Sequence, residues 1–338
     1  MAASPDALTS WHSDWTGVTV AVVGLGEEGF ALADTLAELG ALTTVVTTQP
    51  DGDRQAILDV LGVDVAVVDD DAAVVSELQA RAPDLIVISP DWEPDREREA
   101  ELGQLETTIW SDVEFSWRVA DKHGSRPDVV FVAGAAQAIE LADVAQRFLL
   151  HSGRVAARGG DDAPPVLDAL RHPDGVDVVL WTLTPRQLWR MGNDPDTARR
   201  PRVSVGWDAP GTLEPEALEA LYTDTVESCF YQPDTASEKA LENASVIEGA
   251  RAIGVVGGTP GMSDLGRVEN VIVDRAFLPD RKDRALELCT LDELLDAGFH
   301  SPEAVEMAIA ALGVARALGV APELLGGALQ TGQWPERK

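Results

Sequence analysis

Residues 127–149, PDVVFVAGAAQAIELADVAQRFL, contain an apolar run, a stretch of small residues and then an apolar segment with helical period. This order predicts a buried strand, a tight turn and a helix, the arrangement in which phosphate-binding loops occur. The turn has no lysine, and no serine or threonine at its end: Gly134-Ala135-Ala136-Gln137-Ala138-Ile139. A phosphate loop needs that lysine for the phosphates and that hydroxyl for Mg²⁺. Only Gly134 therefore remains of such a loop.

Strand and helix patterns alternate along the rest of the chain. Apolar runs rich in Val and Ile predict strands in the first half at 18–26, 42–48, 63–68 and 84–89. Such runs indicate a parallel sheet that is covered on both faces. The second half predicts strands at 128–134, 152–160, 175–183, 202–208 and 227–232, and two terminal helices that begin at Pro302 and Pro322.

A polar stretch at 121–127 separates the two halves and reads as a linker. We therefore expect an α/β protein with a Rossmann-like parallel-sheet domain over residues 1–124. A second α/β domain, of phosphate-loop type, is expected over residues 125–338.

The composition limits the partners of the chain. Its 338 residues include 26 basic and 58 acidic side chains, a net charge of −32, which repels nucleic acid and anionic membranes. No apolar run reaches the length of about 18 residues that a membrane helix needs, and the first residues lack the layout of a signal peptide. We expect a soluble, cytoplasmic protein. Cys229 and Cys289 match no metal spacing and are expected to be buried thiols.

A second glycine-rich turn lies near the start of the chain. Gly24-Leu25-Gly26-Glu27-Glu28-Gly29 fits the dinucleotide-binding pattern G-x-G-x-x-G between a predicted strand and helix. The next strand ends Val46-Thr47-Thr48-Gln49, with no acid for a ribose and no arginine for a 2′-phosphate. The two glutamates also stand at the helix N-terminus, where they would repel a phosphate. Two interpretations stay open: the glycines allow a tight turn, or they bind a nucleotide.

Several segments together resemble the Mur ligases, in particular the actinobacterial UDP-N-acetylmuramoyl-alanine:D-glutamate ligases. They are TGVTVAVVGLGEEGFALADTLAELGA, DLIVISPDWEPD, IWSDVEFSWRVADK, PVLDALRHPDGVDVVL, VIEGARAIGVVGGTPGMSDLG and AIAALGVARALGVAPELLGGAL. The resemblance implies a domain for the UDP substrate, a central ATPase domain and a third domain for the amino acid. The chain is expected to stop at the end of the second.

The resemblance also implies ATP-driven amide formation through an acyl phosphate, with two Mg²⁺ ions and a carbamylated lysine. The residues that would perform it are replaced in this sequence. The lysine of the phosphate loop falls on Ala138, its metal-binding hydroxyl on Ile139, the metal-binding glutamate on Thr182 and the carbamylated lysine on Leu218. In the first domain, the uridine-binding hydroxyl falls on Glu28, and the motif S-P-G has become Ser89-Pro90-Asp91.

These losses predict a catalytically impaired or inactive homologue that acts by binding or regulation in peptidoglycan synthesis. We expect no catalytic residue, no metal ligand and no cofactor, although the family uses ATP and Mg²⁺. The expected binding residues are Gly134, as a vestigial phosphate loop, and Gly24, Leu25, Gly26, Gly29 and Ser89, as a UDP-type loop. The expected partner is a cell-wall synthesis protein or an intact ligase. One alternative is a working ATP-dependent ligase completed by a partner chain; a weaker one is an NAD(P)-binding oxidoreductase.

Overall fold

The computed structural model describes residues 4–134, 136–192, 199–207, 213, 215–332 and 334. The chain forms two compact units. The first contains the residues up to Arg126 together with Pro164–Pro173, and the second contains Pro127–Ala163 and the residues from Asp174 onward. The sequence placed the boundary near residue 124 and the segment 164–173 in the second domain, whereas this segment packs with the first unit.

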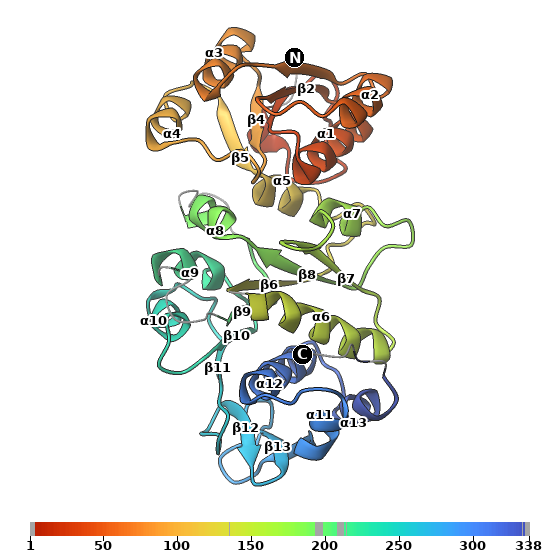
Figure 1. The fold of residues 1–338 in the computed structure, drawn as a ribbon, viewed down its shortest axis with the longest axis vertical. Coiled ribbons are helices and arrows are strands. Elements are labelled where there is room, and N and C mark those ends of the chain that lie inside the picture. The colour runs from red at the N-terminus through yellow and green to blue at the C-terminus, as the bar shows by residue number, and fades with distance from the viewer. Residues whose placement is uncertain are drawn as a thin grey trace. The chain divides into compact units, whose positions relative to one another are not determined.

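The first unit is built on a five-stranded parallel sheet with the strand order β3-β2-β1-β4-β5. Its strands are β1 (Thr19–Val23), β2 (Leu42–Thr47), β3 (Asp64–Val67), β4 (Leu85–Ile88) and β5 (Thr108–Ser111). Its helices are α1 (Glu27–Leu39), α2 (Gly52–Val60), α3 (Asp71–Arg81), α4 (Arg96–Leu102), α5 (Asp112–Arg118) and α7 (Val166–Leu170). Figure 1 shows these elements in the red to yellow part of the ribbon, with α7 in green.

Local signals explain where the helices of the first unit begin. Asp51, Asp70 and Asp95 each accept hydrogen bonds from the backbone at the start of α2, α3 and α4, and Ser111 does so for α5. These side chains satisfy amide groups that have no partner within the helix. The helix α1 begins without a side-chain cap from its own N-cap residue, Gly26.

The second unit contains a nine-stranded sheet with the order β14-β13-β12-β11-β10-β9-β6-β8-β7. Along the sheet, neighbouring strands from β7 through β8, β6, β9, β10 and β11 to β12 pair in parallel. The β12–β13 and β13–β14 pairs are antiparallel. They are β6 (Asp128–Gly134), β7 (Ala156–Gly160), β8 (Val178–Leu183), β9 (Val203–Trp207), β10 (Ser228–Tyr231), β11 (Arg251–Val255), β12 (Asp264–Val268), β13 (Val271–Asp274) and β14 (Leu286–Thr290).

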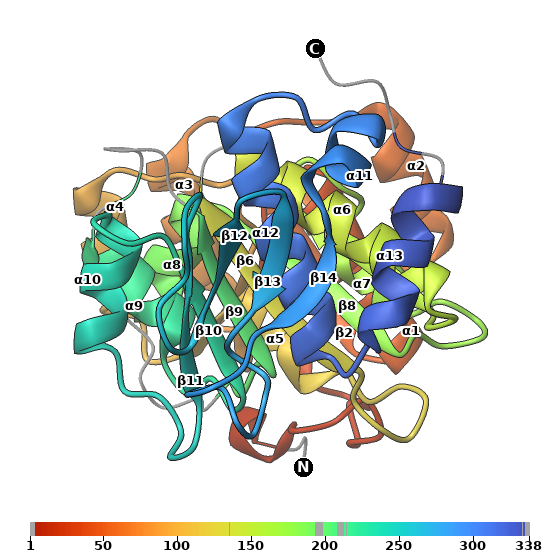
Figure 2. The ribbon, with the colours of Figure 1, turned by 90° about the horizontal axis from the view of Figure 1, so that it is seen from below.

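The helices of the second unit are α6 (Ala136–His151), α8 (Pro185–Gly192), α9 (Pro215–Tyr222), α10 (Ala236–Asn243), α11 (Leu291–Asp296), α12 (Pro302–Ala317) and α13 (Pro322–Thr331). The helix α12 packs against α6, as Figure 2 shows, and both contribute to one large apolar core. Because α12 is buried along almost its whole length, it acts as a central core helix.

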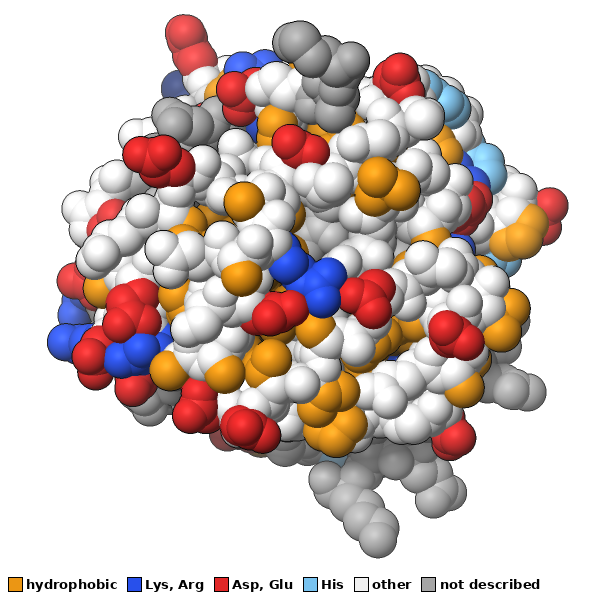
Figure 3. Space-filling model, turned by 90° about the horizontal axis from the view of Figure 1, so that it is seen from above, with side chains coloured by type: hydrophobic (Ala, Val, Ile, Leu, Met, Phe, Trp, Pro, Cys, Tyr) orange, Lys and Arg blue, Asp and Glu red, His pale blue; other side chains and the backbone are white. Residues whose placement is uncertain are grey.

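The expected α/β fold class, a parallel-sheet domain followed by a second α/β domain, is confirmed. The strands β11 to β14 and several short helices were not predicted from the sequence. Both cysteines are buried free thiols, as expected, and burial raises the pKa of the Cys229 thiol to about 12. Within the residues that the structure describes, no helix is long and apolar enough to cross a membrane. On the face drawn in Figure 3, Lys and Arg side chains lie beside Asp and Glu side chains and form no positive patch.

Candidate functional site

The first glycine turn lies at the carboxyl ends of two neighbouring strands. Val23 pairs with Ile88, so the turn that follows β1 lies next to Ser89, which follows β4. Ser89 is fully buried, and its N–H donates to the Val23 carbonyl at 3.0 Å. A Cβ on Gly29 would lie 2.3 Å from the Gly24 carbonyl oxygen, so only glycine lets α1 start this close to the turn. The carboxyl edge of such a sheet is where ligands of α/β proteins bind.

Asp91 occupies the space over this turn. Its Oδ2 accepts the N–H of Gly26 at 2.9 Å, and its Oδ1 accepts the hydroxyl of Ser89. A Cβ on Gly24 would lie 2.7 Å from Asp91 Oδ2, and one on Gly26 would lie 2.8 Å from Asp91 Cγ. A carboxylate of the chain itself therefore holds the position in which nucleotide-binding turns hold a phosphate.

Glu28 lies behind the turn in an acidic environment. Burial, and then the neighbouring carboxylates of Asp112, Asp168, Asp91 and Glu27, raise its pKa to about 8. Burial disfavours the charged form of a carboxylic acid, and nearby like charges act in the same direction. At neutral pH the side chain that replaces the expected uridine-binding hydroxyl is therefore mostly protonated.

Arg54 places a cation at the first turn, which was not predicted from the sequence. Its Nη1 donates to the Leu25 carbonyl at 3.1 Å, and its guanidinium lies 3.3 Å from Asp51 and 3.9 Å from Glu27. The residue lies in α2, beyond the end of β2. The N-cap by Asp51 fixes the start of α2 and so brings Arg54 to the turn.

The outer face of α1 is held by two basic residues. Arg171, which follows α7, pairs with Asp34 and, at 2.9 Å, with Glu38. Lys122 pairs with the same Glu38 at 2.6 Å. The Arg171 pairs join residues 164–173 to α1 within the first unit.

The second glycine turn follows β6 and is closed by backbone and apolar side chains. A Cβ on Gly134 would lie 1.8 Å from the Trp207 carbonyl oxygen and 3.2 Å from the Cβ of Ala138. Ala138, at the expected lysine position, is 2% exposed and packs inward. Ile139 is partly buried, and its carbonyl accepts Arg158 Nη1 at 3.4 Å. Ala135 of this turn lies outside the described residues.

The two other ligand positions expected in the second unit hold buried side chains that belong to the packing of the protein. Thr182, where we expected the metal-binding glutamate to fall, is buried, and its hydroxyl donates to the carbonyls of Asp161 at 2.8 Å and Gly159 at 3.2 Å. Leu218, where we expected the carbamylated lysine to fall, is fully buried in α9.

These residues do not fit ATP and magnesium. The lysine, hydroxyl and carboxylate positions hold an alanine, an isoleucine and a threonine whose hydroxyl already has partners. Among the described residues, no group of three or more His, Cys, Asp and Glu side chains is arranged to hold a metal ion.

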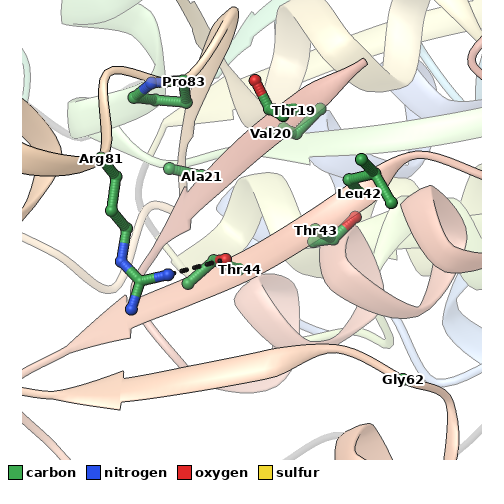
Figure 4. Close-up of a pocket in the computed structure, with 9 residues that line it drawn as sticks. All are labelled: Thr19, Val20, Ala21, Leu42, Thr43, Thr44, Gly62, Arg81 and Pro83. Atoms are coloured by element: carbon green, nitrogen blue, oxygen red, sulfur yellow. Dashed lines mark hydrogen bonds between the residues drawn. The ribbon is translucent and has the colours of Figure 1, made fainter. Parts of the chain in front are cut away.

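A cavity of about 350 Å³ lies at the opposite ends of the strands, where β1 and β2 begin (Figure 4). It is lined by Thr19, Val20, Ala21, Leu42, Thr43, Thr44, Gly62, Arg81 and Pro83. Arg81 donates to Thr44 Oγ1 at 3.2 Å and pairs with Asp64 at 3.0 Å and Glu77 at 2.7 Å. Because its charge is already balanced, the cavity offers a ligand few specific contacts.

Comparisons with known proteins agree with this architecture. No protein-family model matches the chain. The UDP-N-acetylmuramoylalanine–D-glutamate ligase of Leifsonia xyli subsp. xyli is 38% identical over 332 residues, which cover 94% of this chain and 64% of that protein. The ligase of the same name from Tropheryma whipplei is 31% identical over 327 residues, 94% of this chain and 67% of that protein. The chain thus spans about two thirds of the length of these relatives.

A solved structure shows the same fold. The UDP-N-acetylmuramate:L-alanyl-gamma-D-glutamyl-meso-diaminopimelate ligase from Neisseria meningitides aligns with a TM-score of 0.55 over 96% of this chain and 100% of that chain, at 12% identity. The fold agrees with that of a Mur ligase, and the sequence relatives place the chain in this class. Within that class, the chain belongs to the UDP-N-acetylmuramoylalanine–D-glutamate ligase family.

Proposed function

We propose that this chain is a non-catalytic member of its family, which acts by binding in peptidoglycan synthesis and not by ATP-driven ligation. One observation carries the proposal. The four positions of the second unit at which the resemblance implies phosphate and metal ligands contain Ala138, Ile139, Thr182 and Leu218, and three of these side chains are buried in the protein.

The chemistry explains why these changes matter together. Phosphoryl transfer depends on cations positioned around the phosphates, with little covalent help from the protein. The loss of one preorganised electrostatic contact commonly lowers a rate by about 10²–10³. Losses within one site are not additive, but even one or two of them leave very slow turnover.

The proposal is tested by calorimetry and by a coupled assay of ADP release. We expect no heat of binding with ATP–Mg²⁺ at millimolar concentration. We also expect no ADP release with UDP-N-acetylmuramoyl-alanine and D-glutamate, under conditions in which the Leifsonia xyli relative serves as positive control. Micromolar ATP affinity would contradict the proposal, as would amino-acid-dependent ADP release with or without an added partner protein.

A double variant tests whether the second turn has lost only its phosphate-binding side chains or has also been closed by apolar packing. Ala138→Lys combined with Ile139→Thr restores the two side-chain types of a phosphate loop. Because Ala138 packs inward against Gly134, we expect the double variant to lose stability and still bind no ATP. Recovery of ATP binding would show that the turn keeps its open form and would weaken the proposal.

A further inference from the structure

The first glycine turn contains its own anion. The Asp91 carboxylate accepts the Gly26 N–H and the Ser89 hydroxyl, and it lies where side chains at residues 24 and 26 would be. The contact joins residues 65 positions apart in the sequence. It forms because β1 and β4 are neighbours whose carboxyl ends meet at one edge of the sheet.

The backbone conformation of Gly26 indicates why a glycine occupies this position. Its φ of −67° and ψ of −165° are open to any residue, so the backbone conformation does not require glycine here. The Cβ that a larger residue would bring collides with the Asp91 carboxylate, and no other atom is as near. Because Gly26 has no side chain, an anion can approach the N-terminus of α1. Amide groups and the helix dipole favour negative charge at this position.

We infer that Asp91 is an autoinhibitory contact, an internal carboxylate that closes the first turn to phosphate-bearing ligands. An external phosphate needs the same N–H group and the same space, and it meets the charge of Asp91 as well. Asp91 itself is exposed, so removing its side chain leaves the space over the turn open to solvent and creates no buried cavity.

Two neighbouring residues make the opened turn suitable for a phosphate. Arg54, held by the Leu25 carbonyl and paired with Asp51 at 3.3 Å and Glu27 at 3.9 Å, places a cation beside the turn that a phosphate would share with these carboxylates. In the unaltered protein, burial first and then Asp112, Asp168, Asp91 and Glu27 raise the pKa of Glu28 to about 8, and without Asp91 the other causes still act in this direction. At pH 6.5 the acid behind the turn is therefore less charged than an ordinary glutamate and repels a phosphate less.

The test compares Asp91→Gly with Asp91→Asn in the full chain at pH 6.5. Binding of inorganic pyrophosphate, UDP and uridine is measured by calorimetry, after circular dichroism has shown that each variant is folded. We expect Asp91→Gly to bind pyrophosphate and UDP about tenfold or more tightly than the unaltered protein does. Asp91→Asn keeps an oxygen that accepts the Gly26 N–H, and is expected to gain much less. Uridine is expected to gain nothing.

Two further arms sharpen the result. Adding Arg54→Gln to Asp91→Gly should reverse most of the gain, and raising the pH above 8 should weaken binding as Glu28 ionises. Equal affinity of the unaltered protein and Asp91→Gly, including no binding by either, would overturn the inference, as would an equal gain for uridine. The inference does not rest on the proposed function, since the assay contains neither ATP nor magnesium.

Discussion

The two glycine turns share a frame and differ in what fills it. Each follows a parallel strand and leads into a helix. In the first turn, a charged group, Asp91, lies over the backbone N–H at the start of α1. In the second, a carbonyl of Trp207 and the apolar side chain of Ala138 close around Gly134. The strand–turn–helix unit of a nucleotide site can thus form as part of the fold without a ligand. The atoms that lie over the turn determine whether a ligand can bind there.

The comparison also separates two ways of losing a ligand. A turn blocked by a carboxylate at the surface keeps its open geometry and can be reopened by one substitution. A turn closed by buried packing has become part of the core, because the apolar side chains around Ala138 are packed without space for a lysine. We therefore expect substitutions in the second turn to change stability, and substitutions in the first to change binding and pH dependence.

The largest effect is expected for Gly134→Ala. The new Cβ would lie 1.8 Å from the Trp207 carbonyl oxygen, at a φ of +152° that side chains rarely adopt. The strands β6 and β9 would have to separate where Gly134 pairs with Trp207. We expect a loss of about 3–5 kcal/mol in the free energy of unfolding of the second unit, measured by urea denaturation.

Gly153→Ala is the matched control. Gly153 also has a positive φ, of +87°, but nothing lies within 4 Å of its Cβ position. Only backbone strain then opposes the substitution, and the expected loss is about 1 kcal/mol. Equal losses for the two variants would show that the close approach of Trp207 to the turn is not what requires glycine.

The next effect concerns the first turn and depends on pH. The folded chain holds the pKa of Glu28 near 8, against about 4.5 when unfolded, so the folded state binds more protons between these values. The contribution of Glu28 to stability therefore falls as the pH rises from about 4.5 to 8 and is constant above. This difference corresponds to about 5 kcal/mol at most, and relaxation of the site reduces it. We expect Glu28→Gln to stabilise the protein by about 2–4 kcal/mol at pH 9 and hardly at all at pH 4.

The measurement is urea unfolding of both proteins at pH 4, 6, 7.5 and 9. Glu27→Gln is the control, because Glu27 is the preceding residue of the same helix and its side chain is 74% exposed. It should leave most of the pH dependence in place. A constant difference between Glu28→Gln and the unaltered protein across this range would show that folding does not raise the pKa of Glu28.

The comparison of the two turns also shows how far sequence reasoning extends. Both strand–turn–helix units were predicted, because apolar runs and glycine positions carry the signal locally. The role of Asp91 was not predicted: the sequence shows that it replaces a glycine, but only the pairing of β1 with β4 brings it over Gly26. Arg54 was missed for a similar reason, since its position depends on where α2 begins.

The strands β12 and β13 were missed for a local reason. The first, Asp264–Val268, contains a glycine and an arginine, and the hairpin turns at Glu269 and Asn270 with a positive φ at the glutamate. Neither the alternation nor the usual Asn-Gly turn signal is present. Pairing with neighbouring strands, and not local preference, makes this segment β-structure.

A smaller effect is expected at the ion pairs that support the first turn from outside. Arg171→Gln removes the guanidinium that joins Asp34 and Glu38 on α1, with a side chain that is 19% exposed. Two charged partners lose a shared donor, and we expect a loss of about 1–2 kcal/mol in the first unit. Arg284→Gln is the control in the second unit. It breaks an exposed pair with Asp280 at 3.0 Å, and about 0–0.5 kcal/mol is expected. Equal effects in chemical denaturation would show that the Arg171 pairs are no stronger than surface pairs.

The smallest effect sharpens the interpretation of the second turn. Thr182→Val keeps the shape of the side chain and removes the hydroxyl that donates to the Asp161 carbonyl. If this hydroxyl serves only the fold, its loss costs about 1 kcal/mol of stability and changes no ligand binding. Thr223→Val, which removes an exposed hydroxyl bonded to the Glu219 carbonyl at 2.9 Å, should cost less. A drop in magnesium or nucleotide affinity with unchanged stability would instead place Thr182 in a working site, and the second turn would then resemble the first.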